Sequence, residues 1–489
     1  MQSPYQRLTL FALIALTFLG CKNYNKLPTP PALPSKGIRN KTFQHIPSRA
    51  TITPTPLDTF VETPTEIQGT EQLADSDLQS SRSSTQIEIF EELWNIVDQE
   101  YLYSDYNGLE WNVIYEEYLL RIKNGISDDE FYKLMKELLS RLGDDHSIFL
   151  DPNQVDAEDA RFRGEYDYVG IGVYLVSVPD RNRAVILVTM RGSPAEKAGL
   201  KPRDSILMVD GKTILDENGV LRDLIRGPLG TNVTLTVQSP NEKPRQITIE
   251  RQQINSNIRV PFQILTTPGG KKIGYVLLVT FTDKSIEEQI GGILTLMKIN
   301  GVRDGLIIDN RMNEGGSEIV LARTLSYFTK GTLGYFIGRE NYRPLDVGKG
   351  RNINLSQNFP IVVLIGPMTK SYGEVFAGVL KDIDRAYIIG EKTEGNIETL
   401  WGYNFKDGSR AWIAHDTFSP LNHPEQDWET NGIIPDKIVE VKWEAFSLED
   451  DPAIFAASDH IDKVHRTRRL DQGDIILTSG VKKQFITPK

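Results

Sequence analysis

Cysteine is almost absent from this sequence of 489 residues, since Cys21 is the only one. A lone thiol cannot form an internal disulfide, so the folded body has no disulfide framework. Histidine is also scarce, and the six histidines show neither the HExxH pattern nor the His-x₃-His spacing of common metal sites. The sequence therefore predicts no cofactor and no metal.

An excess of positive charge and a long apolar run are missing as well. The net charge of −11 excludes a nucleic-acid partner, because phosphate binding needs clustered Lys and Arg. The N-terminal apolar run, Leu8 to Leu19, is shorter than the ~20 residues that span a membrane. It follows Arg7 and ends in Phe18-Leu19-Gly20-Cys21, which predicts an export signal over residues 1–21.

Cleavage before Cys21 would leave its thiol at the mature N-terminus, where a bacterial-type lipoprotein carries its lipid. We therefore expect an exported protein anchored by lipid on the outer side of the cell membrane or envelope. Phe18 and Leu19 depart from the preferred lipobox residues, so plain secretion and an uncleaved anchor remain alternatives.

Composition and periodicity divide the rest of the chain and predict a multidomain α+β protein. Residues 22–85 are rich in Pro, Thr and Ser, which predicts a disordered tether. Helical spacing of apolar residues predicts a small helical domain over 86–160, and short β-like runs between turns predict a β-rich domain over 168–254. Strand-like runs alternate with helical segments over 255–445, as in an α/β core, and 446–489 predicts a C-terminal helix and tail.

The β-rich part resembles a PDZ domain in three stretches: GSPAEKAGLKP at 192–202, DSILMVDG at 204–211 and RGPLGT at 226–231. The resemblance implies that a peptide adds a strand to a sheet edge and that backbone amides bind its terminal carboxylate. The tetrapeptide Gly170-Ile171-Gly172-Val173 looks like that carboxylate-binding loop. An ordinary turn between strands is the alternative for its glycines.

Three segments of the α/β part resemble the family of C-terminal processing and tricorn-type serine peptidases. They are DNRMNEGG at 309–316, KSYGE at 370–374 and GEKTEG at 390–395. With the PDZ and helical parts, the resemblance spans about residues 86–461. It implies a catalytic core of the ClpP/crotonase type and endopeptidase activity on polypeptides with free or unstructured C-termini.

Ser371 is the predicted nucleophile. It follows the apolar run Ile361–Ile365 and a turn, and it opens an apparent helix whose N-terminus can stabilise negative charge. With Glu374 it matches the S-x-x-E pattern of the family. The same pattern fits an ordinary capping box, which is the alternative.

The tetrahedral intermediate of acyl transfer also needs N–H donors for its oxyanion. Gly315 and Gly316 follow a strand and resemble the N-x-G-G turn of the family. The amide of Gly315 or Gly316, together with that of Tyr372, is therefore the predicted oxyanion hole. An ordinary strand-to-helix turn is the alternative.

At the general base, the sequence departs from the bacterial processing peptidases. Where these carry a lysine, this chain has Asn396, and an amide cannot accept a proton near neutral pH. Lys370 and Lys392 are the alternative lysine bases. The tricorn branch implies a histidine and a glutamate instead, and GDDHS at 143–147 and WETNGIIPD at 428–436 resemble its two segments.

His146 is accordingly the predicted base, with an imidazole pKa near ~6.5, and Glu429 the carboxylate that orients it. A helix-end charge is the alternative role for His146, and a solvated loop carboxylate is the alternative for Glu429. The expected function is that of a serine endopeptidase that captures C-termini through its PDZ domain. A catalytically silent, peptide-binding lipoprotein is the other hypothesis, motivated by the missing lysine.

Overall fold

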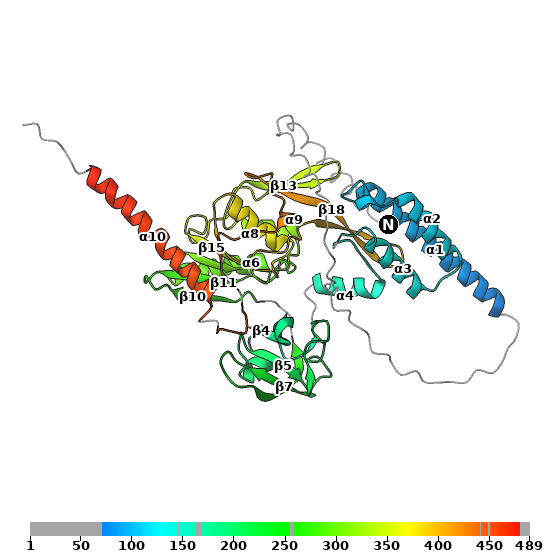
Figure 1. The fold of residues 1–489 in the computed structure, drawn as a ribbon, viewed down its shortest axis with the longest axis horizontal. Helices are drawn as coiled ribbons and strands as arrows, with labels where there is room; N and C mark the ends of the chain where they lie inside the picture. The colour runs from blue at the N-terminus through cyan, green and yellow to red at the C-terminus, as the bar shows by residue number, and fades with distance from the viewer. Residues whose placement is uncertain are drawn as a thin grey trace, which may run out of the picture. The chain divides into compact units, whose positions relative to one another are not determined.

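The computed structural model describes residues 71–144, 146–162, 168–254, 259–440, 442–447 and 450–479. The predicted signal peptide, Cys21 and most of the predicted tether lie outside these residues. The described chain contains an N-terminal helical region, a β-rich domain and an α/β core (Figure 1). This architecture confirms the predicted multidomain α+β class. Within the described residues, no helix combines the length and the apolar character that crossing a membrane requires.

The helical region surrounds its own apolar cluster, in which side chains such as Phe90, Leu93 and Phe131 are buried. Ser127 and Glu130 cap its third helix reciprocally, which fixes where that helix begins. Its elements are α1 (Glu71–Glu100), η1 (Tyr106–Gly108), α2 (Trp111–Lys123), α3 (Asp128–Ser140), β1 (Ile148–Leu150) and α4 (Pro152–Phe162).

The tether prediction is wrong for residues 71–85, which form the first half of α1. This stretch contains neither proline nor glycine, so nothing in its backbone opposes helix formation. Its serine content suggested disorder, but serine is only mildly unfavourable within a helix.

The β-rich domain is an antiparallel sheet in the order β3-β4-β5-β7-β8, with β6 paired to β5. Strands β2 and β9 pair at the two ends of the domain, with Tyr168 opposite Ile254, so the chain enters and leaves it side by side. The elements are β2 (Tyr168–Gly170), β3 (Val173–Val178), η2 (Pro179–Arg181), β4 (Arg183–Thr189), α5 (Pro194–Lys197), β5 (Ser205–Val209), β6 (Lys212–Thr213), β7 (Asn232–Gln238), β8 (Arg245–Glu250) and β9 (Gln252–Ile254).

The α/β core is built on a sheet in the order β10-β11-β12-β15-β16-β19, parallel from β11 to β19. Alternate residues of its strands pack against α6, α7 and α8 on one face and against α10 on the other. The elements are β10 (Phe262–Thr266), β11 (Lys272–Leu277), α6 (Ile286–Ile299), β12 (Leu306–Asp309), α7 (Glu318–Leu325), β15 (Ile361–Ile365), α8 (Tyr372–Asp382), β16 (Tyr387–Gly390), β19 (Lys437–Ile438) and α10 (Pro452–Ser479). The C-terminal helix expected within 446–489 is α10, which ends at Ser479.

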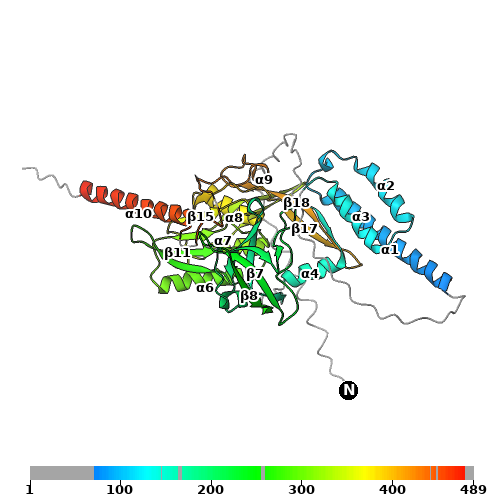
Figure 2. The same cartoon turned by 60° about the horizontal axis from the view of Figure 1, so that its bottom comes forward.

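A second sheet joins the helical region to the core, in the order β1-β18-β13-β14 with β17 on β18 (Figure 2). Strand β1 pairs antiparallel with β18, and Phe149 lies opposite Ala411. Side chains of β18 complete the apolar cluster of the helical region, so the segment before β1 is held against the core. The remaining elements are β13 (Thr332–Gly338), β14 (Tyr342–Asp346), β17 (Thr399–Asn404), β18 (Arg410–Pro420) and α9 (Trp428–Asn431).

Candidate active site

Ser371 lies between the end of β15 at Ile365 and the start of α8 at Tyr372, as the sequence predicted. Its backbone has φ 51° and ψ −128°, a conformation that is strained for a residue with a side chain. Its hydroxyl makes no capping hydrogen bond to α8, and its amide donates to the carbonyl of Asn396 at 2.7 Å. The capping-box alternative is therefore wrong.

The Glu374 carboxylate fixes the neighbouring segment instead of capping α8. Its Oε1 accepts the amide of Gly395 at 3.0 Å and its Oε2 accepts the amide of Asn396 at 2.8 Å. The side chain is fully buried, and this burial outweighs the hydrogen bonds to the carboxylate and raises the pKa of Glu374 to about 7. Glu374 thus holds residues 395–396 against the start of α8.

Gly315 approaches Ser371 so closely that a larger residue does not fit. A Cβ atom added at Gly315 would lie 2.9 Å from Oγ of Ser371 and 2.9 Å from the amide nitrogen of Tyr372. Its own amide donates to Oδ1 of Asn313 at 3.0 Å. The amides of Gly316 and Tyr372 donate to no residue that the structure describes, so these two amides are available to a ligand.

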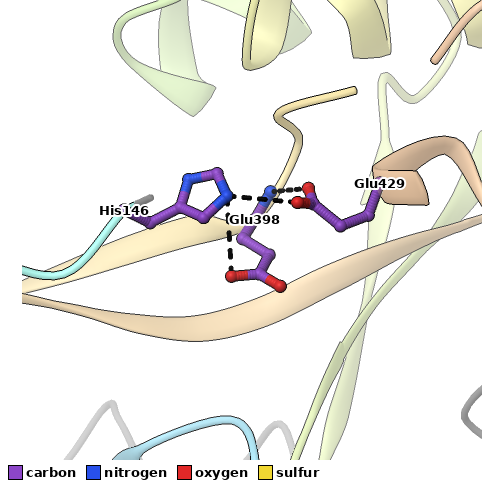
Figure 3. Close-up of side chains that lie close together, drawn as sticks. All are labelled: His146, Glu398 and Glu429. Atoms are coloured by element: carbon purple, nitrogen blue, oxygen red, sulfur yellow. Dashed lines mark hydrogen bonds and ion pairs between the residues drawn. The ribbon is translucent and has the colours of Figure 1, made fainter. Parts of the chain in front are cut away.

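His146 lies just before β1 and is carried to the core by the pairing of β1 with β18. The hydroxyl of the next residue, Ser147, accepts the amide of Ala414 at 3.1 Å and fixes this approach. Nε2 of His146 lies 3.2 Å from Oε1 of Glu429, across 283 residues of sequence (Figure 3). The structure therefore brings the predicted histidine and glutamate together.

Glu429 belongs to α9 and is buried, so the alternative of a solvated loop carboxylate is wrong. Its Oε2 accepts the amides of Ile397 at 2.8 Å and Glu398 at 3.3 Å, while its Oε1 faces His146. One carboxylate thus holds both the imidazole and the segment that follows Asn396.

Burial opposes protonation of the His146 imidazole, but neighbouring carboxylates reverse the outcome. The hydrogen bond to Glu429 and the charges of Glu398, Glu429 and Asp144 raise the pKa of His146 to about 9. The expectation of an ordinary imidazole pKa is therefore wrong for this arrangement. At neutral pH the ring is mostly protonated and forms an ion pair.

Glu398 is a member of this cluster that the sequence did not reveal. Its Oε2 lies 3.6 Å from Nε2 of His146 (Figure 3). Its Oε1 accepts a hydrogen bond from the hydroxyl of Tyr103. Burial raises the pKa of Glu398 to about 7, against the opposing effect of His146. Its position two residues after Asn396, which stands where the bacterial processing peptidases carry their lysine base, was the signal in the sequence.

The structure records no hydrogen bond between His146 and the hydroxyl of Ser371 among the described residues. The two groups are connected through residues 396–398, whose backbone bonds Ser371 at one end and Glu429 at the other. Lys370 pairs with Glu394 at 3.2 Å near the surface, and Lys392 is exposed. Among the described residues, the arrangement thus offers a serine hydroxyl without a hydrogen bond, two amides without an acceptor and a buried imidazole–carboxylate pair.

Three family models match separate parts of the chain. Peptidase family S41 matches residues 272–439, which include Ser371. The PDZ domain matches residues 185–239, and the tricorn protease C1 domain matches residues 87–140 in the helical region. Along the chain, the three matches coincide in turn with the helical region, the β-rich domain and the α/β core.

Curated relatives cover most of the chain. A carboxyl-terminal-processing protease of Synechocystis sp. is 30% identical over 369 residues, 74% of this chain and 82% of the relative. The chain belongs to the carboxyl-terminal-processing proteases of peptidase family S41. The chloroplastic carboxyl-terminal-processing peptidase 2 of Arabidopsis thaliana is 29% identical over 360 residues, 71% of this chain and 68% of the relative.

Among solved structures, the photosystem II D1 C-terminal processing protease matches with a TM-score of 0.52 and 26% identity. The match covers 73% of this chain and 93% of the chain of that protease. These likenesses confirm the predicted family, the fold class and a serine-type peptidase.

In this carboxyl-terminal-processing protease, the predicted carboxylate-binding loop connects β2 to β3. Ile171 is fully buried in the PDZ core, and Gly172 packs so tightly that an added Cβ would lie 2.5 Å from Cβ of Ser193. Val173 begins β3, which lies at one edge of the PDZ sheet. An edge strand directly after this loop is the geometry that peptide addition requires.

Proposed function

We propose that this protease cleaves polypeptides by attack of Ser371 on the scissile carbonyl, with His146 as general base and Glu429 as the carboxylate that orients it. The observation that carries the proposal is the buried contact between His146 and Glu429, at 3.2 Å and 283 residues apart in sequence. The sequence predicted both residues for this role. Glu429 also accepts the amide of Ile397, and the neighbouring residue Asn396 accepts the amide of Ser371 through its carbonyl. Residues 396–397 therefore connect the pair to Ser371.

The surroundings of Ser371 support its role as the nucleophile. A strained serine between a strand and a helix resembles the turn that exposes the nucleophile in other serine hydrolases. The N-terminus of α8 favours the negative charge that develops during attack. We assign the oxyanion hole to the amides of Tyr372 and Gly316, since Gly315 already donates to Asn313.

Proton transfer requires an imidazole nitrogen within ~2.6–3.2 Å of Oγ of Ser371. We propose that His146 makes this contact in the substrate complex, because catalytic hydrogen bonds often tighten only when substrate is bound. Nδ1 is the free nitrogen for it, since no described residue bonds Nδ1 while Nε2 faces Glu429.

We further propose that substrates enter through their C-termini. A peptide strand would add to β3 along the edge that pairs with no strand among the described residues, with its terminal carboxylate on the backbone of the tetrapeptide 170–173. The exported, lipid-anchored state through Cys21 belongs to the same proposal, and its support is the N-terminal sequence alone.

A fluorophosphonate probe with peptide mapping tests the nucleophile directly. We expect labelling at Ser371, together with hydrolysis of an unstructured polypeptide that Ser371→Ala abolishes. Glu429→Gln keeps the shape of the side chain but removes its charge, so it should lower kcat by less than loss of His146 does. A folded sample that is neither labelled nor active would support the silent, peptide-binding alternative, which is favoured by the lack of a hydrogen bond between His146 and Ser371 among the described residues.

A further inference from the structure

Two carboxylates converge on one imidazole nitrogen in the cluster of His146, Glu398 and Glu429 (Figure 3). Their facing atoms all lie within 4.8 Å of one another. The three residues are only 8%, 3% and 7% exposed, respectively. A serine peptidase triad needs one carboxylate beside its histidine, so the second carboxylate requires a separate explanation.

Each carboxylate is fixed through one oxygen and presents the other to Nε2. Glu429 uses Oε2 for the amides of residues 397 and 398, and Glu398 uses Oε1 for the hydroxyl of Tyr103. Oε2 of Glu398 is buried and accepts no hydrogen bond from any described residue. A buried carboxylate oxygen without a donor is costly, which points to a cationic ligand at this position.

The spacing of the donor atoms suits a tetrahedral metal ion. Bonds of about 2.0–2.2 Å from such an ion to nitrogen and oxygen put neighbouring ligand atoms roughly 3.3–3.6 Å apart. Nε2 of His146 lies 3.2 Å from Oε1 of Glu429 and 3.6 Å from Oε2 of Glu398. The hydrogen bonds on the outer oxygens would orient the ligands, as second-shell contacts do in metal sites.

The negative charges of Glu398 and Glu429 also favour a metal cation. With all three groups in the deprotonated form that binds a metal, the two carboxylates carry two negative charges beside a neutral imidazole, and a divalent cation balances them. We propose that His146, Glu398 and Glu429 bind one divalent transition-metal ion, with Zn²⁺ as its representative, and that this binding inhibits the protease. Mg²⁺ is excluded as the ligand because it prefers six oxygen donors in octahedral geometry.

The inhibitory part rests on the proposed function, in which His146 is the base. A metal on Nε2 holds the imidazole at the two glutamates and withdraws its electron density, so the ring cannot take the proton of Ser371. Binding displaces the proton of the imidazolium, and a chelator that removes the metal restores the base.

Equilibrium dialysis of tag-free, chelator-treated full-length protein against Zn²⁺, with metal analysis, tests the site without any activity measurement. We expect Zn²⁺ binding that Glu398→Gln weakens roughly tenfold or more. Glu250→Gln, which changes an exposed carboxylate of the PDZ domain, should bind as the parent protein does. The Ser371→Ala protein should also bind fully, because Ser371 is not a ligand.

A second readout keeps the test valid if Glu398→Gln folds poorly. Zn²⁺, but not Mg²⁺, should raise the Tm of the parent protein, and Co²⁺ should give the visible absorption of a tetrahedral site. No Zn²⁺ binding, or equal binding by the Glu398→Gln and parent proteins, overturns the metal site.

Peptidase assays then decide the inhibitory role. Zn²⁺ should lower the activity of the parent and Glu250→Gln proteins reversibly, whereas the residual activity of Glu398→Gln should respond much less. Binding without inhibition overturns the inhibitory role. A metal-free protein without peptidase activity counts against the proposed function instead, and the dialysis result still decides the metal site.

Discussion

Gly315→Ala is the substitution that tests the geometry around Ser371 most directly. The new methyl group would lie 2.7 Å from Cβ and 2.9 Å from Oγ of Ser371, and 2.9 Å from the amide nitrogen of Tyr372. Contacts this short force the serine or the start of α8 to move. The methyl group also intrudes where the proposed oxyanion would lie.

Gly315→Ala is expected to have two separable effects, a loss of folding stability and a loss of kcat. Gly315 has φ +88°, so alanine there pays the left-handed penalty of about 1–2 kcal/mol in the free energy of unfolding. Gly331 is the matched control, because it has φ +80° and no atom within 4 Å of an added Cβ. Gly331→Ala carries the same backbone penalty without the contact with Ser371.

The assay compares kcat and chemical unfolding of the two variants with the parent protein. Both should lose similar stability apart from the clash, but only Gly315→Ala should lose kcat by about 10²–10³-fold, as loss of an oxyanion-hole donor does. If Gly315→Ala folds and keeps the kcat of Gly331→Ala, the inferred position of the oxyanion beside Ser371 is wrong.

The other predictions concern the base and the anchor. His146→Ala should lower kcat by several orders of magnitude, while Lys370→Ala and Lys392→Ala should change the rate of the chemical step little. A near-normal kcat without His146 would favour one of the two lysines as the base. Peptidase activity should rise with pH through an apparent pKa near 9, because only the neutral imidazole of His146 accepts a proton. An apparent pKa near ~6.5 would instead show that the carboxylates move away from His146 in the reactive complex. Since the folded-state pKa is raised, protonated His146 stabilises the fold fully below pH ~6.5, and this contribution is lost as pH rises through about 9. Cys21→Ala should move the protein from the membrane fraction to a soluble or unprocessed form, and normal signal cleavage with unchanged membrane retention would contradict lipidation.

Local patterns predicted the surroundings of Ser371 well. The apolar run 361–365, the turn and the following helical pattern are neighbours in sequence, so the strand, the loop and α8 follow from short-range preferences. The capping-box alternative could not be rejected in the same way. Whether Glu374 bonds back to Ser371 or across to residues 395–396 depends on a segment distant in sequence.

The rest of the site depends on tertiary contacts between segments that are distant in sequence. His146 and Glu429 were predicted from family resemblance, because no periodicity links residues 283 positions apart. Glu398 was missed because its burial depends on the approach of Tyr103 from the helical region. The raised pKa of His146 follows from its hydrogen bond to Glu429 and from the charges of Glu398, Glu429 and Asp144. The sequence therefore predicted His146 as the base but not its charge at neutral pH.

The pairing of β1 with β18 also ties peptidase activity to completion of the whole fold. The proposed base comes from the N-terminal region and the proposed nucleophile from the core, and the contact that fixes the base spans 267 residues, from Ser147 to Ala414. This pairing cannot form until the chain has been made past residue 414. A nascent or truncated chain in which β1 does not pair with β18 would therefore lack the proposed base beside the core, and so would be unable to cleave itself while it folds.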